Sequence, residues 1–388
     1  MAGDAACRQA VVLVGGEGTR LRPITSRVPK PIVPLAGRPF VGYILENLAR
    51  HDVARAVFSA GYLADSLRAA IGGGERYGLE VRYVVEERPL GTAGAIRNVA
   101  AELDEGPLFA FNGDVLTDVD LSAMREFHTR HRGLATILLT RVDDPRRYGL
   151  VEIADDGRVL EFVEKPGAEY AVPAHGALIN AGVYLLEPEV LDLIPAGRQL
   201  SVERGVFPQL AAEGRLYAFV SDAYWRDIGT PESYLQAHFD LLQGTIATSV
   251  SADLGASYLF VAPDAVVAAG AKVVPPAHVG AGTTLAAGSR IGPLAVVGAG
   301  CTIAAGAEVT ESVVQDDVTI GAQAAIGRSV VVSGATIGEN CHVRNAVIGD
   351  GCRIGADNVI ANGCCLFPET VLADGAVRFR ELDGGDGL

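Results

Sequence analysis

Residues 9 to about 243 alternate between short apolar stretches and amphipathic stretches in which apolar residues recur at helical spacing. Short stretches rich in β-branched residues predict buried strands, and the amphipathic stretches predict helices. The expected strands include residues 10–14, Ala56–Ala60, Val81–Val85, Leu108–Phe111 and Ala135–Thr140. The expected helices include Val41–Arg50, Ala93–Leu103 and Leu121–His131. This alternation predicts an α/β fold in which helices cover both faces of a mostly parallel sheet.

A final helix is expected to close this first part of the chain. Thr230 is a suitable N-cap, and Pro231 suits the first helical position. The apolar face of this helix would comprise Tyr234, Leu235, Phe239 and Leu242. We therefore predict a first domain over residues 1–244 and a linker over residues 245–257.

After Gly244 the composition shifts to Gly, Ala, Ser and Val, and the apolar period becomes six residues. Apolar residues stand at nine positions spaced by six: Val261, Val267, Val273, Val279, Leu285, Ile291, Val297, Ile303 and Val309. The register then slips by single residues and resumes at Ile320, Ile326, Ile337, Val343, Ile348 and Ile354. Three hexapeptides form one triangular coil of a parallel β-helix, with the apolar residues pointing inward. The repeats resemble those of left-handed β-helix domains, and we assign residues 258–388 to such a domain.

The most specific local motif follows the first predicted strand, in the run GGEGTRLRPITSRVPKP from Gly15 to Pro31. Glycines without side chains let backbone N–H groups approach phosphate oxygens. Arg20 and Lys30 add positive charge to the same stretch. Since ligands of open α/β sheets collect at the carboxyl ends of strands, the motif predicts a nucleotide-phosphate site there.

Spacing excludes two common phosphate loops. A P-loop needs Gly-Lys-Ser/Thr in succession, but Gly18 is followed by Thr19 and Arg20. The dinucleotide fingerprint needs a third glycine where this chain has Leu21. Neither a P-loop enzyme nor an NAD-dependent enzyme fits the sequence.

The use of lysine supports a chemical role for two residues. The chain has 29 Arg but only three Lys, namely Lys30, Lys165 and Lys272. Lys30 stands between two prolines, and Lys165 stands in Glu-Lys-Pro. A compact ammonium fits a crowded phosphate where the broad guanidinium fork does not. We therefore expect Lys30 and Lys165 to contact phosphate groups.

The glycine-rich run as a whole resembles the signature of the sugar-1-phosphate nucleotidylyltransferases. The stretches Pro-Leu-Gly-Thr-Ala-Gly and Phe-Asn-Gly-Asp-Val-Leu-Thr are most similar to those of bacterial mannose-1-phosphate guanylyltransferases. The resemblance implies a Rossmann-like domain that condenses a nucleoside triphosphate with a sugar 1-phosphate to give an NDP-sugar and pyrophosphate. GTP and mannose 1-phosphate are the expected substrates. Because a sugar phosphate is already ionised near neutral pH, catalysis would rest on positioning and charge neutralisation.

The resemblance also implies the catalytic roles of five residues. Arg20 and Lys30 would bind the leaving pyrophosphate, and Lys165 would bind the sugar phosphate. Asp114 and Asp227 would hold Mg²⁺ against the α-phosphate. Mg²⁺ suits carboxylate and phosphate oxygens and keeps several waters, so two aspartates are enough. As alternatives, Asp114 in Asn-Gly-Asp is a turn residue, and Asp227 is a loop acceptor.

The nucleotide-binding residues implied by the resemblance are Leu13, Gly15, Gly16, Gly18, Thr19, Glu86, Gly91, Thr92, Asn112 and Gly113. Glu86 stands where some thymidine- and uridine-using relatives carry glutamine. A carboxylate only accepts hydrogen bonds, and the pairing edge of guanine offers adjacent N–H donors. We therefore expect Glu86 to favour guanine, and a solvated Glu86 is the alternative.

Sugar contacts are implied for Gly149, for Glu164 with Lys165, and for Asn180 and Gly182 of Asn-Ala-Gly. Glu164 and Asn180 would hold ring hydroxyls. The segment between the Glu-Lys-Pro and Asn-Ala-Gly motifs lacks the acidic Asp-Gln-Ile lead-in expected of close mannose-1-phosphate guanylyltransferases. Another hexose or a cyclitol 1-phosphate, with GTP, UTP or dTTP, therefore remains open.

Charge and composition limit the classes of molecule that the protein is expected to bind. The formal net charge of −15 disfavours nucleic acid and anionic membranes, so the expected partners are small anions. No apolar run approaches the length of a membrane span, and the first residues do not resemble a signal peptide, which predicts a cytoplasmic protein. The six Cys contain no C-x-x-C pair, and we expect buried free thiols rather than disulfides or zinc.

Two other functions are consistent with parts of the chain. One is a bifunctional enzyme whose β-helix is an acyltransferase, with His278 and His342 as candidate bases, although both are expected at corners of the coils. The other is a catalytically silent regulatory homologue, but such a protein would be expected to lack Arg20, Lys30 or one of the aspartates. The open end of the β-helix and its smooth side favour assembly into a homo-oligomer.

Overall fold

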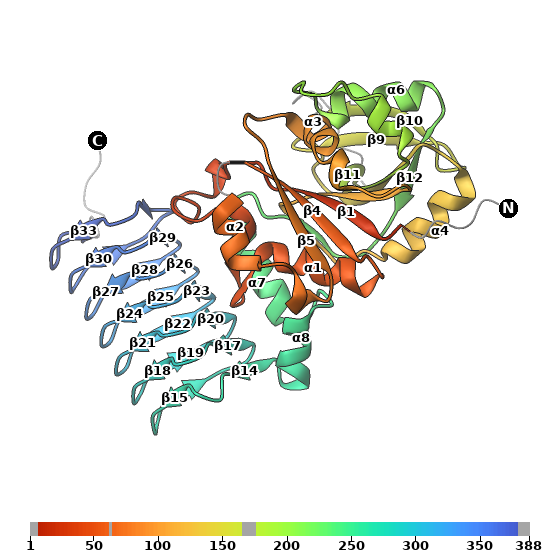
Figure 1. Cartoon of the computed structure of the whole chain (residues 1–388). Helices are drawn as coiled ribbons and strands as arrows, with labels where there is room; N and C mark the ends of the chain where they lie inside the picture. The colour runs from red at the N-terminus through yellow and green to blue at the C-terminus, as the bar shows by residue number, and fades with distance from the viewer. Residues whose placement is uncertain (1–6, 62–63, 165–175, 379–388) are drawn as a thin grey trace, which may run out of the picture. The chain divides into compact units, whose positions relative to one another are not determined.

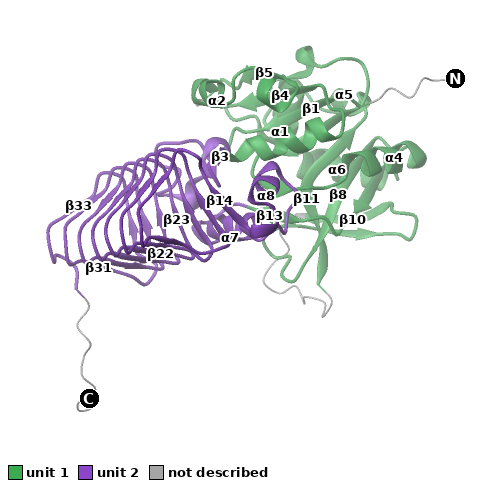
Figure 2. Ribbon diagram, turned by 90° about the horizontal axis from the view of Figure 1, so that it is seen from below, with its two compact units in different colours: residues 1–17, 39–227 green, residues 18–38, 228–388 purple. Residues whose placement is uncertain are grey.

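The computed structural model describes residues 7–61, 64–164 and 176–378 (Figure 1). These form two compact units (Figure 2). The first unit comprises residues 1–17 and 39–227, and the second comprises residues 18–38 and 228–388. The signature segment 18–38 therefore belongs to the same compact unit as the β-helix. The domain boundaries expected at residues 244 and 257 remain predictions.

The described part of the first unit contains a mixed sheet in the order β10-β9-β11-β6-β1-β4-β5, with β8 and β12 joined through β11. Its strands are β1 (Gln9–Leu13), β4 (Arg55–Ala60), β5 (Glu80–Val85), β6 (Leu108–Asn112), β8 (Ala135–Val142), β9 (Gly149–Ile153), β10 (Val159–Glu164), β11 (Ala177–Leu186) and β12 (Leu216–Val220). Strands β5, β4, β1 and β6 are parallel, as predicted. The other half is different, because β11 runs antiparallel to β6 and β8 and a short loop forces β9 and β10 antiparallel.

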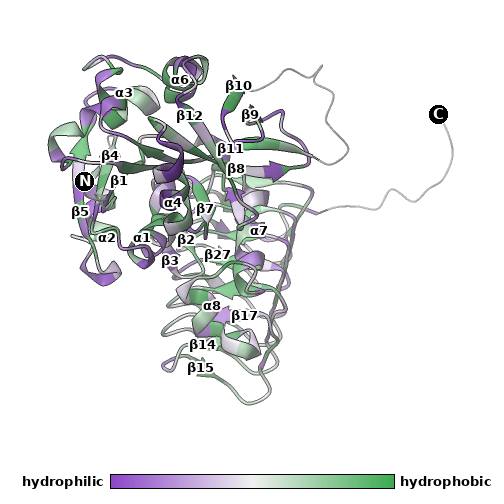
Figure 3. Ribbon diagram, turned by 90° about the vertical axis from the view of Figure 1, so that its right-hand side faces the viewer, coloured by the Kyte–Doolittle hydropathy of each residue, from purple (hydrophilic) through white to green (hydrophobic). Residues whose placement is uncertain are grey.

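The central strands are buried on both faces because their residues are apolar without alternation (Figure 3). Val11 of β1 lies in one hydrophobic cluster with Ile96 and Phe207. Its neighbours Ala10 and Val12 point to the opposite face and are also fully buried. Among the described residues, the α-helices of this unit are α1 (Phe40–Arg50), α2 (Ala64–Ile71), α3 (Gly91–Asn98), α4 (Leu121–His131), α5 (Glu189–Asp192) and α6 (Phe207–Ala212), and a π-helical turn at Val202–Val206 leads into α6. The predicted helix over residues 93–103 is shorter in the structure, since it ends at Asn98 and a 3-10 turn follows at Ala100–Glu102.

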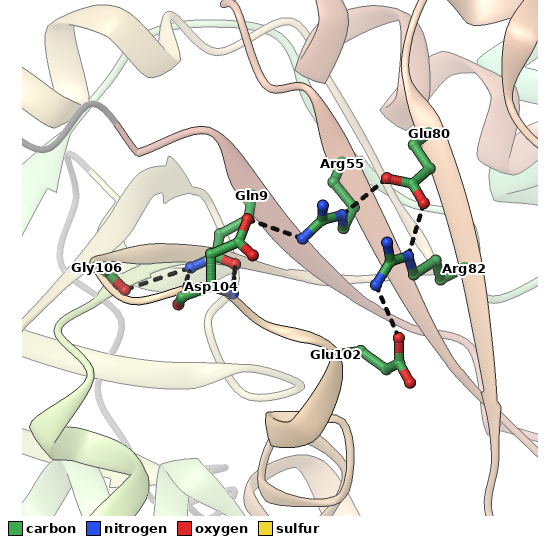
Figure 4. A network of polar contacts seen from close by, with 7 residues as sticks. All are labelled: Gln9, Arg55, Glu80, Arg82, Glu102, Asp104 and Gly106. Carbon is green, nitrogen blue, oxygen red and sulfur yellow. Dashed lines mark hydrogen bonds and ion pairs between the residues drawn. The ribbon is translucent and has the colours of Figure 1, made fainter.

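A polar network joins the amino ends of β1, β4 and β5 (Figure 4). Arg55 donates to the carboxylates of Glu80 and Asp104 at 2.9 and 2.8 Å. Arg82 also donates to Glu80 at 2.7 Å, and the Gln9 side chain donates to the Asp104 carbonyl at 2.9 Å. Exposed ion pairs of this kind contribute about 1 kcal/mol or less each. The network lies at the opposite ends of these strands from the glycine-rich run.

The described part of the second unit contains a parallel β-helix with three sheets. The first sheet contains β14 (Leu259–Val261), β17 (Ala277–Val279), β20 (Ala295–Val297), β23 (Ser312–Val314), β26 (Val330–Val331), β29 (Val347–Ile348) and β32 (Cys365–Leu366). The second contains β15 (Val266–Val267), β18 (Thr284–Leu285), β21 (Thr302–Ile303), β24 (Thr319–Ile320), β27 (Thr336–Ile337), β30 (Arg353–Ile354) and β33 (Val371–Leu372). The third contains β16 (Lys272–Val273), β19 (Arg290–Ile291), β22 (Glu308–Thr310), β25 (Ala325–Gly327), β28 (His342–Arg344) and β31 (Val359–Ile360).

The predicted apolar positions of the repeats form the interior of the coils. Those from Val279 to Ile354 lie in one buried cluster. Val267 of the first coil is 44% exposed, because the solenoid is open at that end. The register slip is a change of coil length: Val279 pairs with Val297, 18 residues on, whereas Val297 pairs with Val314, 17 residues on. The shorter coil places Glu311 at a corner with φ of +46°.

Two capped helices precede the β-helix. Helix α7 (Pro231–Leu242) begins as predicted, with Thr230 and Ser233 forming a capping box. Helix α8 (Ser249–Leu254) lies within the segment expected to be a linker. The buried Tyr234 hydroxyl of α7 donates to the Pro34 carbonyl and accepts from Gln315. Segment 18–38 is thereby tied to the second unit.

The cysteines are all free thiols, as predicted. Cys7, Cys301, Cys341 and Cys352 are buried. The prediction of burial is wrong for Cys365, because alternation along β32 points this residue outward and Leu366 inward. Among the described residues, no helix combines the length and hydropathy needed to cross a membrane.

Replacing Ile320 with Ala should lower the free energy of unfolding by about 2–5 kcal/mol, because it leaves a cavity inside the stacked coils. Ile320 is fully buried between Ile303 and Ile337 of the adjacent coils. Urea unfolding of the full chain measures the effect. Thr319→Ala, at the exposed neighbour on the same strand, is the control and should change the unfolding free energy by less than about 0.5 kcal/mol. Equal losses in both variants would contradict the inward register.

Candidate functional site

The glycine-rich run leaves the sheet at the carboxyl edge of its parallel strands. Leu13, the last residue of β1, lies beside Ser59 of β4 and Asn112 of β6. The Gly113 N–H donates to the Leu13 carbonyl at 2.9 Å. A Cβ at Gly113 would lie 2.6 Å from that oxygen, so only glycine allows this close approach. The structure thus brings the first glycines and the Phe-Asn-Gly-Asp motif to one edge.

Gly15 and Gly16 are exposed at this edge. A Cβ at Gly15 would lie 3.4 Å from Glu86 Oε1, whereas a Cβ at Gly16 would meet nothing within 4 Å. The space beside Gly16 is therefore open to a ligand, as expected for a loop whose amides face phosphate.

Glu86 follows β5 at the same edge and is partly buried. Its Oε1 accepts from the Ser59 hydroxyl at 2.8 Å, and its Oε2 accepts from the Leu90 N–H at 3.1 Å. The carboxylate is therefore held in one orientation rather than solvated freely. Each carboxylate oxygen has a second lone pair, so these contacts are compatible with further acceptance from a base.

The rest of the signature run, which carries Arg20 and Lys30, has its own internal order. Gly18 adopts a φ of +62°, and its carbonyl accepts from the Thr25 hydroxyl at 2.8 Å. A Cβ at Gly18 would lie 3.1 Å from the Cβ of Lys30. Lys30 opens the 3-10 helix Lys30–Ile32 and is 8% exposed, whereas Thr19 and Arg20 are exposed.

Ion pairs that no local pattern predicts connect the same segment to the β-helix and to α8. Arg27 donates to Asp350 at 2.8 Å and to Glu369 at 2.7 Å. Arg38 donates to Asp253 of α8 at 2.8 Å. The segment with Arg20 and Lys30 is therefore supported by residues more than 200 positions away in the chain.

A two-stranded sheet brings the candidate metal ligands together. Strand β7 (Val115–Thr117) pairs antiparallel with β13 (Trp225–Asp227), with Asp227 opposite Val115. Asp114 directly precedes Val115, so both residues lie at the same end of this sheet. Both residues are partly buried. No group of three or more His, Cys, Asp or Glu side chains in the described ranges could hold a metal alone, so phosphate oxygens would have to complete the shell.

Two of the residues expected to bind the sugar, Asn180 and Gly182, lie where the pairing of β11 is irregular. Its pairing with β8 shifts between Asn180 and Tyr184, and Gly182 adopts a φ of +75°. A Cβ at Gly182 would lie 2.8 Å from Asn112 Nδ2, which links this motif to Phe-Asn-Gly-Asp. The Trp225 indole, two residues before Asp227, donates to the Ala181 carbonyl at 2.8 Å.

Gly149 begins β9 and pairs with Glu164 at the end of β10. Leu150, the next residue of β9, pairs with Ile179, which precedes Asn180. The ring of Tyr148 packs against Trp225 with centroids 5.3 Å apart. The backbones of the residues expected to bind the sugar therefore converge. Lys165 lies outside the described residues.

The Thr92 side chain bonds to other protein groups rather than facing the exposed edge of the sheet. Its hydroxyl donates to Glu203 at 2.6 Å and accepts from the Val202 N–H at 2.8 Å. Gly91 and Thr92 begin α3, and a Cβ at Gly91 would lie 2.7 Å from the Leu200 carbonyl. The Thr92 side chain therefore points into the protein, toward Glu203.

Sequence reasoning missed Glu203, although the pattern held a signal. Val206, Phe207 and Leu210 lie three, four and seven residues after it, which is the spacing of one buried helical face. A carboxylate on such a face requires internal hydrogen-bond donors. Glu203 is 9% exposed.

The two histidines of the acyltransferase alternative do not come together. His278 lies within β17 and His342 begins β28, on different sheets, so the prediction that both occupy corners is wrong. The hexapeptide pattern leaves these outward positions of a strand unspecified. His278 stacks on Phe260 at 4.8 Å, and burial lowers the pKa of His278 to about 4.

Two family models match the sequence. One is described as nucleotidyl transferase and matches residues 9–244. The other is described as EIF2B subunit epsilon LbH domain and matches residues 276–377, in agreement with a left-handed β-helix.

Named relatives and solved structures agree with the first match. The mannose-1-phosphate guanylyltransferase of Mycobacterium tuberculosis is 41% identical over 286 residues, which are 71% of this chain and 77% of that protein. The mannose-1-phosphate guanyltransferase of Pichia angusta is 40% identical over 232 residues, 58% of this chain and 62% of that protein. The crystal structure of HddC from Yersinia pseudotuberculosis matches with a TM-score of 0.52 and 32% identity, over 60% of this chain and 98% of that chain. HddC complexed with GMP-PN matches equally well.

Replacing Gly18 with Ala should lower the free energy of unfolding by about 1–2 kcal/mol, because a side chain is strained at a φ of +62° and would crowd Lys30. Thermal or urea unfolding of the full chain measures the change. Gly16→Ala is the matched control, since a Cβ there meets nothing within 4 Å, and its unfolding free energy should stay within about 0.5 kcal/mol. If the two variants were equally stable, the order described for residues 18–30 would be wrong.

Proposed function

Because the chain belongs to the nucleotidyl transferase family, we propose that it condenses GTP with mannose 1-phosphate to give GDP-mannose and pyrophosphate. The observation that carries this proposal is the meeting of three motifs at one edge of the sheet: the first glycines, Phe-Asn-Gly-Asp and the segment that begins with Glu86. The guanylyltransferase relatives and the HddC complex with GMP-PN support GTP as the nucleotide.

The reaction requires positioning more than acid–base chemistry. A phosphate oxygen of mannose 1-phosphate attacks the α-phosphorus of GTP, and the bond between the α- and β-phosphates breaks in line with the attack. One P–O bond forms and one breaks, and pyrophosphate leaves with the electron pair. No proton has to move, because the attacking phosphate is already ionised.

We assign the cations to the phosphates. The backbone amides of Gly15 and Gly16 would face the nucleotide phosphates, and Arg20 and Lys30 would stabilise the charge that develops on pyrophosphate. Lys165 would hold the sugar phosphate, and Asn180 and Glu164 would hold the ring hydroxyls. Desolvation of the buried Lys30 makes its interaction with a phosphate stronger than at an exposed position.

A divalent ion is consistent with the carboxylates. Asp114 and Asp227 lie at one end of the β7–β13 pair and would hold Mg²⁺, which accepts two carboxylates together with phosphate oxygens and water. When bound, the ion neutralises charge on the reacting phosphates. We further expect a cytoplasmic protein that assembles as a homo-oligomer.

Pyrophosphate release tests the proposal directly. With Mg²⁺, the full chain should turn over GTP with mannose 1-phosphate more efficiently than any other pairing of GTP, UTP, dTTP or ATP with hexose or cyclitol 1-phosphates. Lys30→Ala and Asp114→Ala should each lower kcat by about a hundredfold or more, because each removes charge stabilisation of the transition state.

Matched substitutions at exposed residues are the controls for these variants. Lys272→Ala and Asp65→Ala remove the same groups elsewhere and should retain the activity of the unmodified chain. Full activity of the Lys30 or Asp114 variant would contradict its assigned role. Absence of turnover with every pair would favour the silent regulatory homologue.

Glu86→Gln should reduce the preference for GTP over UTP by about tenfold, because an amide offers one acceptor oxygen where the carboxylate offers two. The ratio of kcat/KM values for the two nucleotides measures the preference. Glu87→Gln, at the exposed neighbour, is the control and should keep the original ratio. An unchanged ratio for Glu86→Gln would remove Glu86 from base selection.

A further inference from the structure

The buried carboxylate of Glu203 joins two motifs that the proposed function assigns to different substrates. Its Oε2 accepts from the hydroxyls of Thr92 and Ser201, each at 2.6 Å. Its Oε1 accepts from the Tyr184 hydroxyl at 3.1 Å. Thr92 belongs to the segment expected to bind the nucleotide, and Tyr184 leads to Asn180 of the segment expected to bind the sugar.

We propose that Glu203 is a positioning residue that holds the nucleotide-binding start of α3 and the sugar-binding Asn180 in one fixed relation. This inference rests on the proposed function and adds a residue that touches neither substrate. Glu203 acts through two arms of hydrogen bonds, one ending at α3 and one ending at Asn180.

Each hydroxyl in the network has only one available direction for its proton. The Thr92 oxygen accepts from the Val202 N–H at 2.8 Å, and the Ser201 oxygen accepts from the Arg204 N–H at 3.2 Å. Since a carboxylate can only accept, the proton of each hydroxyl is directed to Glu203, and each hydroxyl oxygen is left to accept from a backbone N–H. The network therefore has a single orientation, which is what a positioning role needs.

In the Tyr184 arm the hydrogen bonds are also donated in the direction of Glu203. The Tyr184 hydroxyl accepts from Asn180 Nδ2 at 3.0 Å and donates to Glu203. Burial and the negative charge of Glu203 raise the pKa of Tyr184, so the hydroxyl keeps its proton. Asn180 Oδ1 accepts from the Gly182 N–H at 3.1 Å. Both ends of the Asn180 amide are thus assigned, and the amide cannot flip without losing a bond.

The α3 arm is equally constrained. The N–H groups of Ala93 and Gly94 donate to the Leu200 carbonyl at 2.9 and 3.2 Å. A Cβ at Gly94 would lie 2.5 Å from the Arg198 carbonyl, so the first turn of α3 packs directly on the chain that leads to Glu203. The first turn of α3 is therefore held both by the segment before Glu203 and by the Glu203 carboxylate.

A KM split tests the two arms separately. Thr92→Val breaks only the α3 arm and should raise the KM for GTP about tenfold while the KM for mannose 1-phosphate stays within about twofold. Tyr184→Phe breaks the Asn180 arm and also removes the hydrogen bond between the Tyr184 hydroxyl and Asn112, so it should raise the KM for mannose 1-phosphate about tenfold and the KM for GTP by a smaller factor. Glu203→Gln should raise both KM values. In the Glu203→Gln background, Thr92→Val and Tyr184→Phe should add less than they do alone, because their shared partner is already altered.

Matched variants separate positioning from loss of stability. Thr136→Val removes the bond of a buried hydroxyl to His128, Tyr83→Phe removes a bond to the Gly72 carbonyl, and Glu80→Gln alters the network at the amino edge (Figure 4). All three lie in the same compact unit as Glu203. Each should leave both KM values within about twofold, whatever it does to the unfolding midpoint.

The outcomes distinguish this inference from the proposed function. If the unmodified chain and the three controls turn over but the two arm variants show no opposite KM split, the positioning role is wrong and the proposed function stands. A uniform fall in kcat across the arm variants and controls would likewise overturn the positioning role. If Glu203→Gln does not fold, the KM values of Thr92→Val and Tyr184→Phe still test the positioning role. Absence of turnover by the unmodified chain would contradict the proposed function, and this inference with it.

Discussion

The parallel register of β1 with β4 and β6 is the constraint on which the site depends. Because parallel strands end at one edge, the register places Leu13, Ser59 and Asn112 side by side, although they are far apart in sequence. Both faces of β1 must be apolar for this arrangement to be buried, and they are. The loops that follow these strands therefore have to meet, and their glycines let the backbones approach closely.

Polar groups inside the first unit hold this edge to the antiparallel half of the sheet. Burying a carboxylate costs free energy unless donors satisfy it, and Glu203 has the hydroxyls of Thr92, Ser201 and Tyr184. The irregular pairing of β11 turns the Asn-Ala-Gly motif toward Asn112. In the second unit, ion pairs at Arg27 and the buried Tyr234 hydroxyl connect the segment with Lys30 to the β-helix and α7.

Local patterns in the sequence predicted much of this structure, because local physics determines those features. The Thr230 cap and the start at Pro231 follow from backbone donors at a helix terminus, and the hexapeptide positions follow from the need to fill a coil interior. Long-range partners were not predictable in the same way. Nothing near Arg27 in the sequence indicates Asp350 as its partner. The hydroxyls of Thr92 and Tyr184 reach Glu203 only after the sheet has formed. The antiparallel half of the sheet was missed because apolar runs do not encode strand direction.

A crystal structure of the full chain with GTP and Mg²⁺ would test the central claim most directly, namely that the carboxyl edge of β1, β4 and β6 is the nucleotide site. The account predicts phosphate oxygens against the amides of Gly15 and Gly16, the metal ion held by Asp114 and Asp227, and the base beside Glu86. Nucleotide bound elsewhere on the protein, with this edge open, would contradict it.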